Sequence, residues 1–90
     1  MANNLRGGNV EEMHQMAKSY ASNSRQLNGI ITELNSRTTG SDSIWTGPAA
    51  ERFRSAWQEA RGSFEKIRHA LDEASTAINK HAQNIEAATR

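Results

Sequence analysis

The side chains that could carry out chemistry in this chain are its 3 histidines and the carboxylates near them. His69 and Glu73 stand four residues apart, so on a helix they would share one face and could ligate a metal ion together. His14 could approach the 72–76 segment if the chain folds into an antiparallel hairpin. Ligands so few and so mixed on exposed faces are usually ordinary surface residues. We therefore expect no metal ion and no other cofactor.

Motifs of catalysis are missing from the sequence. It has no glycine-rich phosphate loop, no Gly-x-Ser-x-Gly and no His-Glu-x-x-His. The chain has 90 residues and is 36% hydrophobic, which leaves little room for a walled pocket. The sequence therefore predicts a protein that is not an enzyme and has no small-molecule substrate.

His81 differs from the other histidines because it falls within an apolar heptad pattern. One interpretation is a neutral imidazole that is hydrogen-bonded at the end of a helix pair. The other is a pH-sensitive latch, because histidine protonates near pH 6.5 and a charge in the seam would loosen the helix end.

The elements that must position these residues are two long helices. Apolar residues recur at alternating steps of three and four from Val10 to Leu34, interrupted by Ser24, and again from Ala50 to Ala88. Asn9 and Glu12 suit a capped helix start, and Pro48 suits the first turn of a helix. We expect helices at about 9–38 and 48–88, a connecting turn at about 39–47 and a flexible tail at about 1–8, within one domain spanning 1–90.

So short a connection returns the chain antiparallel, and the predicted fold is an all-α antiparallel two-helix hairpin. The heptad positions supply its expected core: Val10, Met13, Tyr20, Leu27, Ile31, Leu34, Phe53, Trp57, Phe64, Ile67, Leu71 and Ile78.

Two helices cannot enclose a core on all sides, so we expect the hairpin to dimerise into a four-helix bundle. A second stripe at heptad spacing predicts the dimer interface: Met16, Ile30, Ala49, Ala56, Ala70 and Ala77. A net charge of +1 permits a homodimer, and a second, different hairpin would complete the bundle equally well. A monomeric hairpin with an apolar side remains the simplest alternative.

Charge and hydropathy exclude several further classes. Lys and Arg total 11 against 10 for Asp and Glu, and both signs alternate along the helices, so nucleic acid is not an expected partner. No run approaches the roughly 20 apolar residues of a membrane span. Residues 1–8 lack an apolar segment, so we expect no cleavable signal peptide.

The predicted turn contains Trp45-Thr46-Gly47, followed by Ala49-Ala50-x-x-Phe53. A tryptophan is unusual in a turn, and its ring could cover the end of the core while Gly47 allows a tight bend. A Trp-x-Gly motif between two heptad helices in a chain of this length also resembles the WXG family. These are the early secreted antigen (ESAT)-like proteins of type VII secretion systems, and the resemblance covers essentially the whole chain.

The resemblance implies a helical hairpin that pairs as a homodimer or with a second WXG-type hairpin. It implies export by an ATPase-driven membrane machine without a cleavable signal, and hence a secreted protein that is cytoplasmic before export. Members serve as co-exported adaptors or chaperones, or as toxins and host-directed effectors. Trp45 and Gly47 match the defining motif, and the turn would contribute to an export surface. The alternative is a helical-bundle interaction or chaperone protein that stays inside the cell.

The chain departs from the family pattern at its C-terminal end. Many pairs carry a tyrosine followed four residues later by an acidic residue after the second helix. Here the only tyrosine is Tyr20, and residues 86–90 are Glu-Ala-Ala-Thr-Arg. Three expectations remain open: a partner supplies that export element, another signal replaces it, or this chain alone is not exported.

Overall fold

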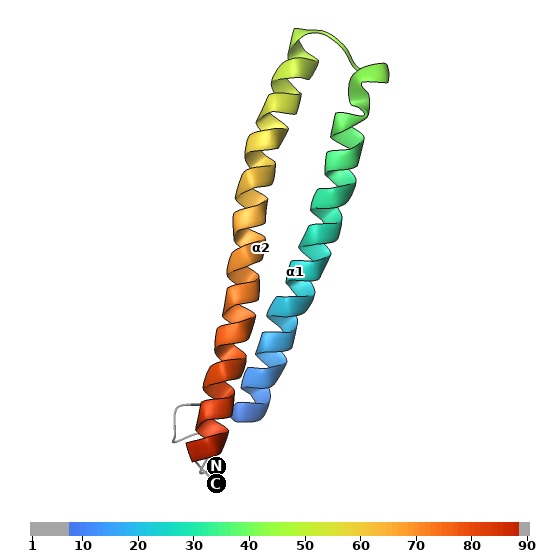
Figure 1. The fold of residues 1–90 in the computed structure, drawn as a ribbon. Helices are drawn as coiled ribbons and strands as arrows, with labels where there is room; N and C mark the ends of the chain where they lie inside the picture. The colour runs from blue at the N-terminus through green and yellow to red at the C-terminus, as the bar shows by residue number, and fades with distance from the viewer. Residues whose placement is uncertain (1–7, 89–90) are drawn as a thin grey trace.

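The chain forms a hairpin of two long helices in a computed structural model, which describes residues 8–88 (Figure 1). Helix α1 spans Val10–Thr39, a short 3-10 helix η2 spans Ser41–Ser43, and α2 spans Pro48–Ala88. The start of α1 and the end of α2 lie together at one end of the hairpin. The predicted all-α, antiparallel two-helix fold is confirmed. The expected tail falls almost entirely on residues 1–7, outside the described residues.

Local sequence explains where the helices begin and end. Asn9 has extended backbone angles, and its side-chain Oδ1 accepts a hydrogen bond from the Glu12 N–H at 3.1 Å, which caps α1 as predicted. At the other end of α1, Gly40 donates its N–H to Ser36 O at 3.0 Å. Helix α2 begins at Pro48, where a missing N–H costs nothing, since the first helical turn has no intrahelical acceptor for it.

Mostly small side chains lie between the two helices. The buried residues are Ala17, Ser24, Ile31 and Thr38 of α1 and Ala50, Trp57, Ser75 and Ala82 of α2. Small residues let helix backbones approach closely, and Ser75 uses this proximity to donate its hydroxyl to Ala17 O at 2.8 Å. Ser24, which interrupts the apolar pattern of the sequence, is therefore a contact residue.

The predicted core needs correction at Leu34, Phe53, Phe64 and Ile67. These side chains are between 36% and 51% exposed, so they are not enclosed between α1 and α2. A strict heptad pattern misplaces them because a helix has 3.6 residues per turn and drifts by about 20° per heptad.

The buried positions of α2 illustrate this drift, since Trp57 and Ser75 are separated by five full helical turns rather than by whole heptads. The other predicted core residues lie closer to the helix interface. Ile31 and Trp57 are buried, and the half-buried ones are Val10, Met13, Tyr20, Leu27, Leu71 and Ile78.

The hairpin is a thin rod of 64 × 16 × 16 Å with a radius of gyration of 19.8 Å. A compact domain of this length would have a radius of gyration of about 12 Å. Its accessible surface is 6632 Å², roughly 1,400 Å² more than is typical of a folded monomer of this mass. A single hairpin therefore leaves much of its surface uncovered. Over residues 8–88, neither helix has a stretch apolar enough to cross a lipid bilayer.

Candidate functional site

The side chains beside the helix interface divide the hairpin into two unlike sides. Three residues after each buried position, wherever that residue still lies within the same α-helix, the side chain is apolar: Tyr20, Leu27, Leu34, Phe53, Ala60, Ile78 and Ile85. Four residues after, it is polar except at Ala21: Asn28, Asn35, Arg54, Arg61, Asn79 and Glu86. Because a helix turns by about 100° per residue, steps of three and four fall on opposite sides of the buried line.

In an antiparallel pair, the corresponding sides of both helices coincide. The structure shows this directly, since Asn35 of α1 contacts Arg61 of α2, and both follow a buried residue by four. We call the first side the apolar flank, consisting of the apolar residues just given with Met13, Met16, Ile30, Phe64 and Ile67. We call the second side the polar flank, consisting of the polar residues just given with His14.

The apolar flank is largely uncovered. Met16, Ile30, Leu34, Phe53 and Ile67 are each between 42% and 53% exposed. The ring of Phe64 lies 6.3 Å from that of Trp57, so the flank is continuous with the buried indole. A group of exposed large apolar side chains on one side of a protein makes this flank a candidate interaction surface.

The residues expected at a dimer interface do not all share this flank. Met16 and Ile30 do, and both are exposed. The alanine stripe drifts by about 20° per heptad, so Ala49 and Ala56 border the flank. Ala70 and Ala77 each lie two residues beyond the contact positions of Arg68 and Ser75, on the outer side of α2.

Several side chains of the polar flank are paired across the hairpin. Asn35 Oδ1 accepts from Trp57 Nε1 at 3.0 Å and from Arg61 Nη1 at 3.3 Å. At the open end, His14 Nδ1 lies 2.9 Å from Asn79 Oδ1. These contacts join α1 to α2 at separate levels, and no buried polar side-chain atom within residues 8–88 lacks a partner.

His14, rather than His81, is the histidine that links the helices. The pKa of His14 is raised, chiefly by its hydrogen bond to the Asn79 side chain and then by Glu86, whose carboxylate lies 3.5 Å from Nε2. His81 is exposed, so the seam position predicted for it is wrong. The heptad pattern placed His81 in the seam because it ignores the drift of a helix with 3.6 residues per turn. His14 follows half-buried Val10 by four residues, which is the spacing of the polar flank. Residues 8–88 contain no cluster of three or more potential metal ligands.

The connecting turn presents Trp45 at the tip of the apolar flank. The Trp45 N–H donates to Ser41 O at 2.9 Å, and the indole lies 5.5 Å from the ring of Phe53. Trp45 remains 43% exposed, so its ring rests on Phe53 and does not seal the end of the hairpin. Gly47 has a φ of +105°, which explains the glycine of the motif, because side chains with a Cβ rarely adopt that angle.

Arg54 is a functional residue that the sequence analysis did not identify. The Arg54 Nη1 group donates to Ser41 Oγ at 2.7 Å and to Trp45 O at 3.1 Å, and Nε lies 3.4 Å from Asp42 Oδ1. Its position four residues after buried Ala50 would have been the signal. That signal requires knowing which positions are buried.

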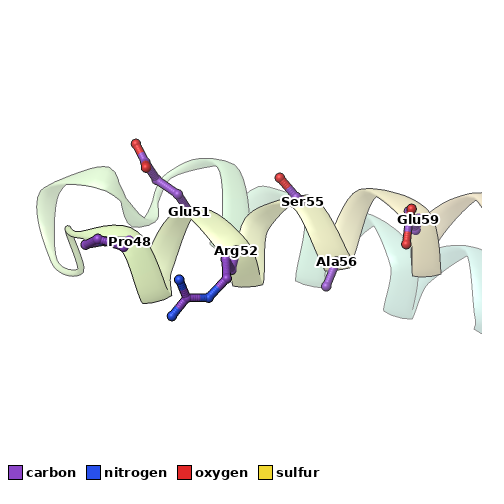
Figure 2. A pocket seen from close by; sticks show the side chains of 6 residues that line it. All are labelled: Pro48, Glu51, Arg52, Ser55, Ala56 and Glu59. Atoms are coloured by element: carbon purple, nitrogen blue, oxygen red, sulfur yellow. The ribbon is translucent and has the colours of Figure 1, made fainter.

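A shallow depression lies on the outside of α2 close to the turn (Figure 2). Its lining residues come from one helix only: Pro48, Glu51, Arg52, Ser55, Ala56 and Glu59. Figure 2 shows Glu51 and Ser55 projecting on one side of the helix and Arg52 and Ala56 on the other, so the side chains do not converge. This depression lacks the opposing wall that a small-molecule site needs.

The chain is similar to known proteins in both sequence and fold. A family model described as proteins of 100 residues with WXG (WXG100) matches residues 8–89. Protein YukE of Bacillus subtilis strain 168 is 26% identical over 76 residues, which cover 84% of this chain and 78% of YukE. The crystal structure of EsxA from Geobacillus thermodenitrificans superposes with a TM-score of 0.83 at 28% identity, covering 90% of this chain and 88% of EsxA.

Proposed function

Because the chain belongs to the WXG100 family, we propose that it is a small non-enzymatic substrate of a type VII secretion system, exported as a folded dimer. The family match and the similarity to YukE and EsxA support the secretion pathway. The uncovered apolar flank is the observation that supports the proposed dimer. After export, the dimer acts as an adaptor or chaperone for another protein, or as an effector.

The dimer places the apolar flank of one hairpin against that of a second copy. The surplus surface of roughly 1,400 Å² exceeds the roughly 800 Å² that each partner buries in a standard interface. A net charge of +1 gives two copies little reason to repel each other. Met16, Ile30, Ala49 and Ala56 contribute to this interface, while Ala70 and Ala77 lie outside it. A second WXG-type hairpin is the other possible partner.

Recognition by the secretion machinery falls to the turn. In the hairpin, Trp45 is exposed at the tip and Gly47 fixes the bend that presents it. We propose that an ATPase-driven membrane machine recognises this surface, so the protein is cytoplasmic before export and leaves without a cleavable signal peptide. The residues present at the turn bind a partner and carry out no reaction.

The solution mass of the purified chain tests the dimer. Light scattering should give about 20 kDa, twice the 10.0 kDa of one chain, with strong helical circular dichroism in the same peak. A mass near 10 kDa with weak helicity would contradict the homodimer and point to a second hairpin that completes the core.

Export of a Trp45→Ala variant tests the recognition surface. Export should fall about tenfold or more, because exposed aromatic anchors dominate recognition surfaces. Mass and helicity should stay unchanged, since Trp45 lies at the tip and is 43% exposed. The assay compares culture supernatants of a bacterium that has a type VII secretion system and produces either protein, with a cytoplasmic marker to exclude lysis.

Ile44→Ala is the matched control, because Ile44 adjoins Trp45 and is 84% exposed. Its export should stay near the wild-type level. Normal secretion of a folded, dimeric Trp45→Ala protein would show that Trp45 is not needed for export. Its role would then be limited to packing on Phe53. Retention of both wild type and variant in the cell would favour the alternative of an intracellular bundle protein.

A further inference from the structure

We propose that Arg54 is a positioning residue for Trp45, holding the turn so that the indole stays on Phe53 and both rings form one tip surface. The positioning is a property of the hairpin alone. Its consequence for export rests on the proposed function. The experiment below separates the two.

The segment that carries Trp45 has little support of its own. Between α1 and α2 it consists mostly of small and polar residues, and Ile44 within it is 84% exposed. Its backbone contacts are short-range: the N–H groups of Ile44 and Trp45 both donate to Ser41 O, at 3.0 and 2.9 Å. Ser41 is held to α1 through its hydroxyl, which donates to Thr38 O at 2.6 Å. These contacts anchor the segment to α1 and leave its attachment to α2 to other groups.

Arg54 supplies that attachment at three points. One guanidinium nitrogen, Nη1, donates to Ser41 Oγ and to Trp45 O, while Nε faces the Asp42 carboxylate at 3.4 Å. Its side chain is only 21% exposed, whereas that of Asp42 is 79% exposed. The planar guanidinium can serve acceptors in several fixed directions at once, and the single ammonium of lysine cannot reproduce that arrangement.

Successive residues of α2 hold opposite ends of Trp45. Arg54 binds its backbone carbonyl from the polar flank, and Phe53 contacts its ring from the apolar flank. These two side chains project about 100° apart on the helix, so one residue of the turn is fixed from two directions. This double contact determines where the indole points.

A fixed indole should bind a partner better than a mobile one, because ordering a large side chain on binding costs free energy. Loss of the Arg54 contacts should therefore weaken recognition at the turn by about threefold to tenfold. That loss is smaller than the one expected for removing the ring itself.

The direct test is nuclear magnetic resonance of the whole dimeric chain. The protein has 2 tryptophans and hence two indole N–H signals, which a Trp45→Phe variant assigns. In Arg54→Gln, we expect cross-peaks between the rings of Trp45 and Phe53 to weaken at least twofold and the Trp45 indole to gain mobility. The Trp57 signal should not change, because Trp57 Nε1 donates to Asn35 Oδ1 and Arg54 takes no part in that contact. Unchanged Trp45 cross-peaks and mobility in a folded Arg54→Gln protein would overturn the proposal.

Two further variants make the test decisive. Arg52→Gln removes the same charge from the same helix, and the Arg52 side chain makes no hydrogen bond or ion pair to any described residue, so it should leave Trp45 unaffected. Arg54→Lys keeps the charge and should give an intermediate effect. If Arg54→Gln does not fold, Arg54→Lys tests the proposal in its place. A wild-type Trp45 signal in Arg54→Lys would show that the guanidinium is not needed to position Trp45, which would overturn the proposal.

Export then measures the consequence. Secretion of Arg54→Gln should fall about threefold to tenfold, and adding Arg54→Gln to Trp45→Ala should cause no further loss. Normal export of Trp45→Ala would contradict the proposed recognition of the turn by the secretion machinery. The magnetic resonance result would still decide whether Arg54 positions Trp45. A loss of export in Arg52→Gln equal to that in Arg54→Gln would mean that charge alone matters and would overturn the positioning role in recognition.

Discussion

The two flanks of the hairpin come from the same two helices, yet the side chains of one are paired within the chain and those of the other are largely exposed. On the polar flank, side chains of α1 and α2 find partners within the chain at three levels, through Arg54 at the turn, Asn35 close to the end of α1 and His14 at the open end. On the apolar flank, large side chains such as Ile30 and Ile67 remain about half exposed. One flank holds the hairpin together, and the other remains uncovered.

This difference explains why the small side chains between α1 and α2 are sufficient for the two helices to pair. They are insufficient to bury the large apolar side chains of the hairpin. Burial of Ala17, Ser24 and Ala82 removes little apolar area from water, and each Å² contributes only about 25 cal/mol. Directional hydrogen bonds therefore set which residues of α1 face which residues of α2. The larger apolar side chains would contribute most of their burial energy only when a second hairpin covers them.

The largest effect should come from a charge placed on the apolar flank. Ile67→Glu should weaken dimerisation about a hundredfold or more, because a symmetric interface loses one apolar side chain and gains one carboxylate from each copy. Sedimentation of a dilution series measures the dissociation constant. The matched control is His69→Glu, two residues away on the opposite side of α2 and also exposed. If His69→Glu weakens the dimer as much as Ile67→Glu, the partner does not bind the apolar flank.

A smaller effect should follow from removing the Asn35 acceptor of the polar flank. Asn35→Ala leaves the indole N–H of Trp57 and a guanidinium N–H of Arg61 without their acceptor, at a cost of about 1–3 kcal/mol. Thermal unfolding at fixed protein concentration should show a melting temperature lower by roughly 5 °C or more. The dissociation constant of the dimer should change little.

Asn28→Ala provides the control for that variant. Asn28 lies one heptad before Asn35 on the same flank, is exposed, and its side chain makes no hydrogen bond to any described residue. Its melting temperature should stay level or rise slightly, since alanine favours helix. Equal losses in both variants would show that the contact with Trp57 contributes nothing.

The smallest effect should be a pH dependence at the open end. Asn79 and Glu86 hold the pKa of His14 above its ordinary value of 6.5, because both face the ring with acceptor oxygens and favour the imidazolium. Lys18 opposes them through its charge. The added stability is therefore fully present below about pH 6.5 and is lost as the pH rises through the raised pKa.

Melting temperatures between pH 5.5 and 8.5 test this dependence. The wild type should lose stability across that range relative to His14→Gln, which cannot be protonated. His81→Gln should keep the wild-type slope, because His81 is exposed. A slope that survives in His14→Gln and vanishes in His81→Gln would restore the latch that the heptad pattern assigned to His81.

The limits of the sequence analysis follow from the period of the α-helix. Asn9, Pro48 and Gly47 act within a few residues of their own position, so the helix starts and the bend could be predicted from local rules. Phe53 and Ile67 were assigned to the hairpin core because a strict heptad keeps one face constant along the whole helix. Over the 41 residues of α2 the true period drifts away from that face, and those side chains move to the flank.

The sequence by itself determined the all-α hairpin, its Trp-x-Gly turn and its family, because periodicity, capping and a short motif are properties of neighbouring residues. Only the tertiary structure decided which side of each helix is covered. It also decided that Asn35 accepts a hydrogen bond from the Trp57 indole and that Arg54 donates one to the Trp45 carbonyl. Those contacts join residues from different elements. Their pairing depends on how α1 and α2 rotate and slide against each other, and the order of residues within either helix does not specify that relation.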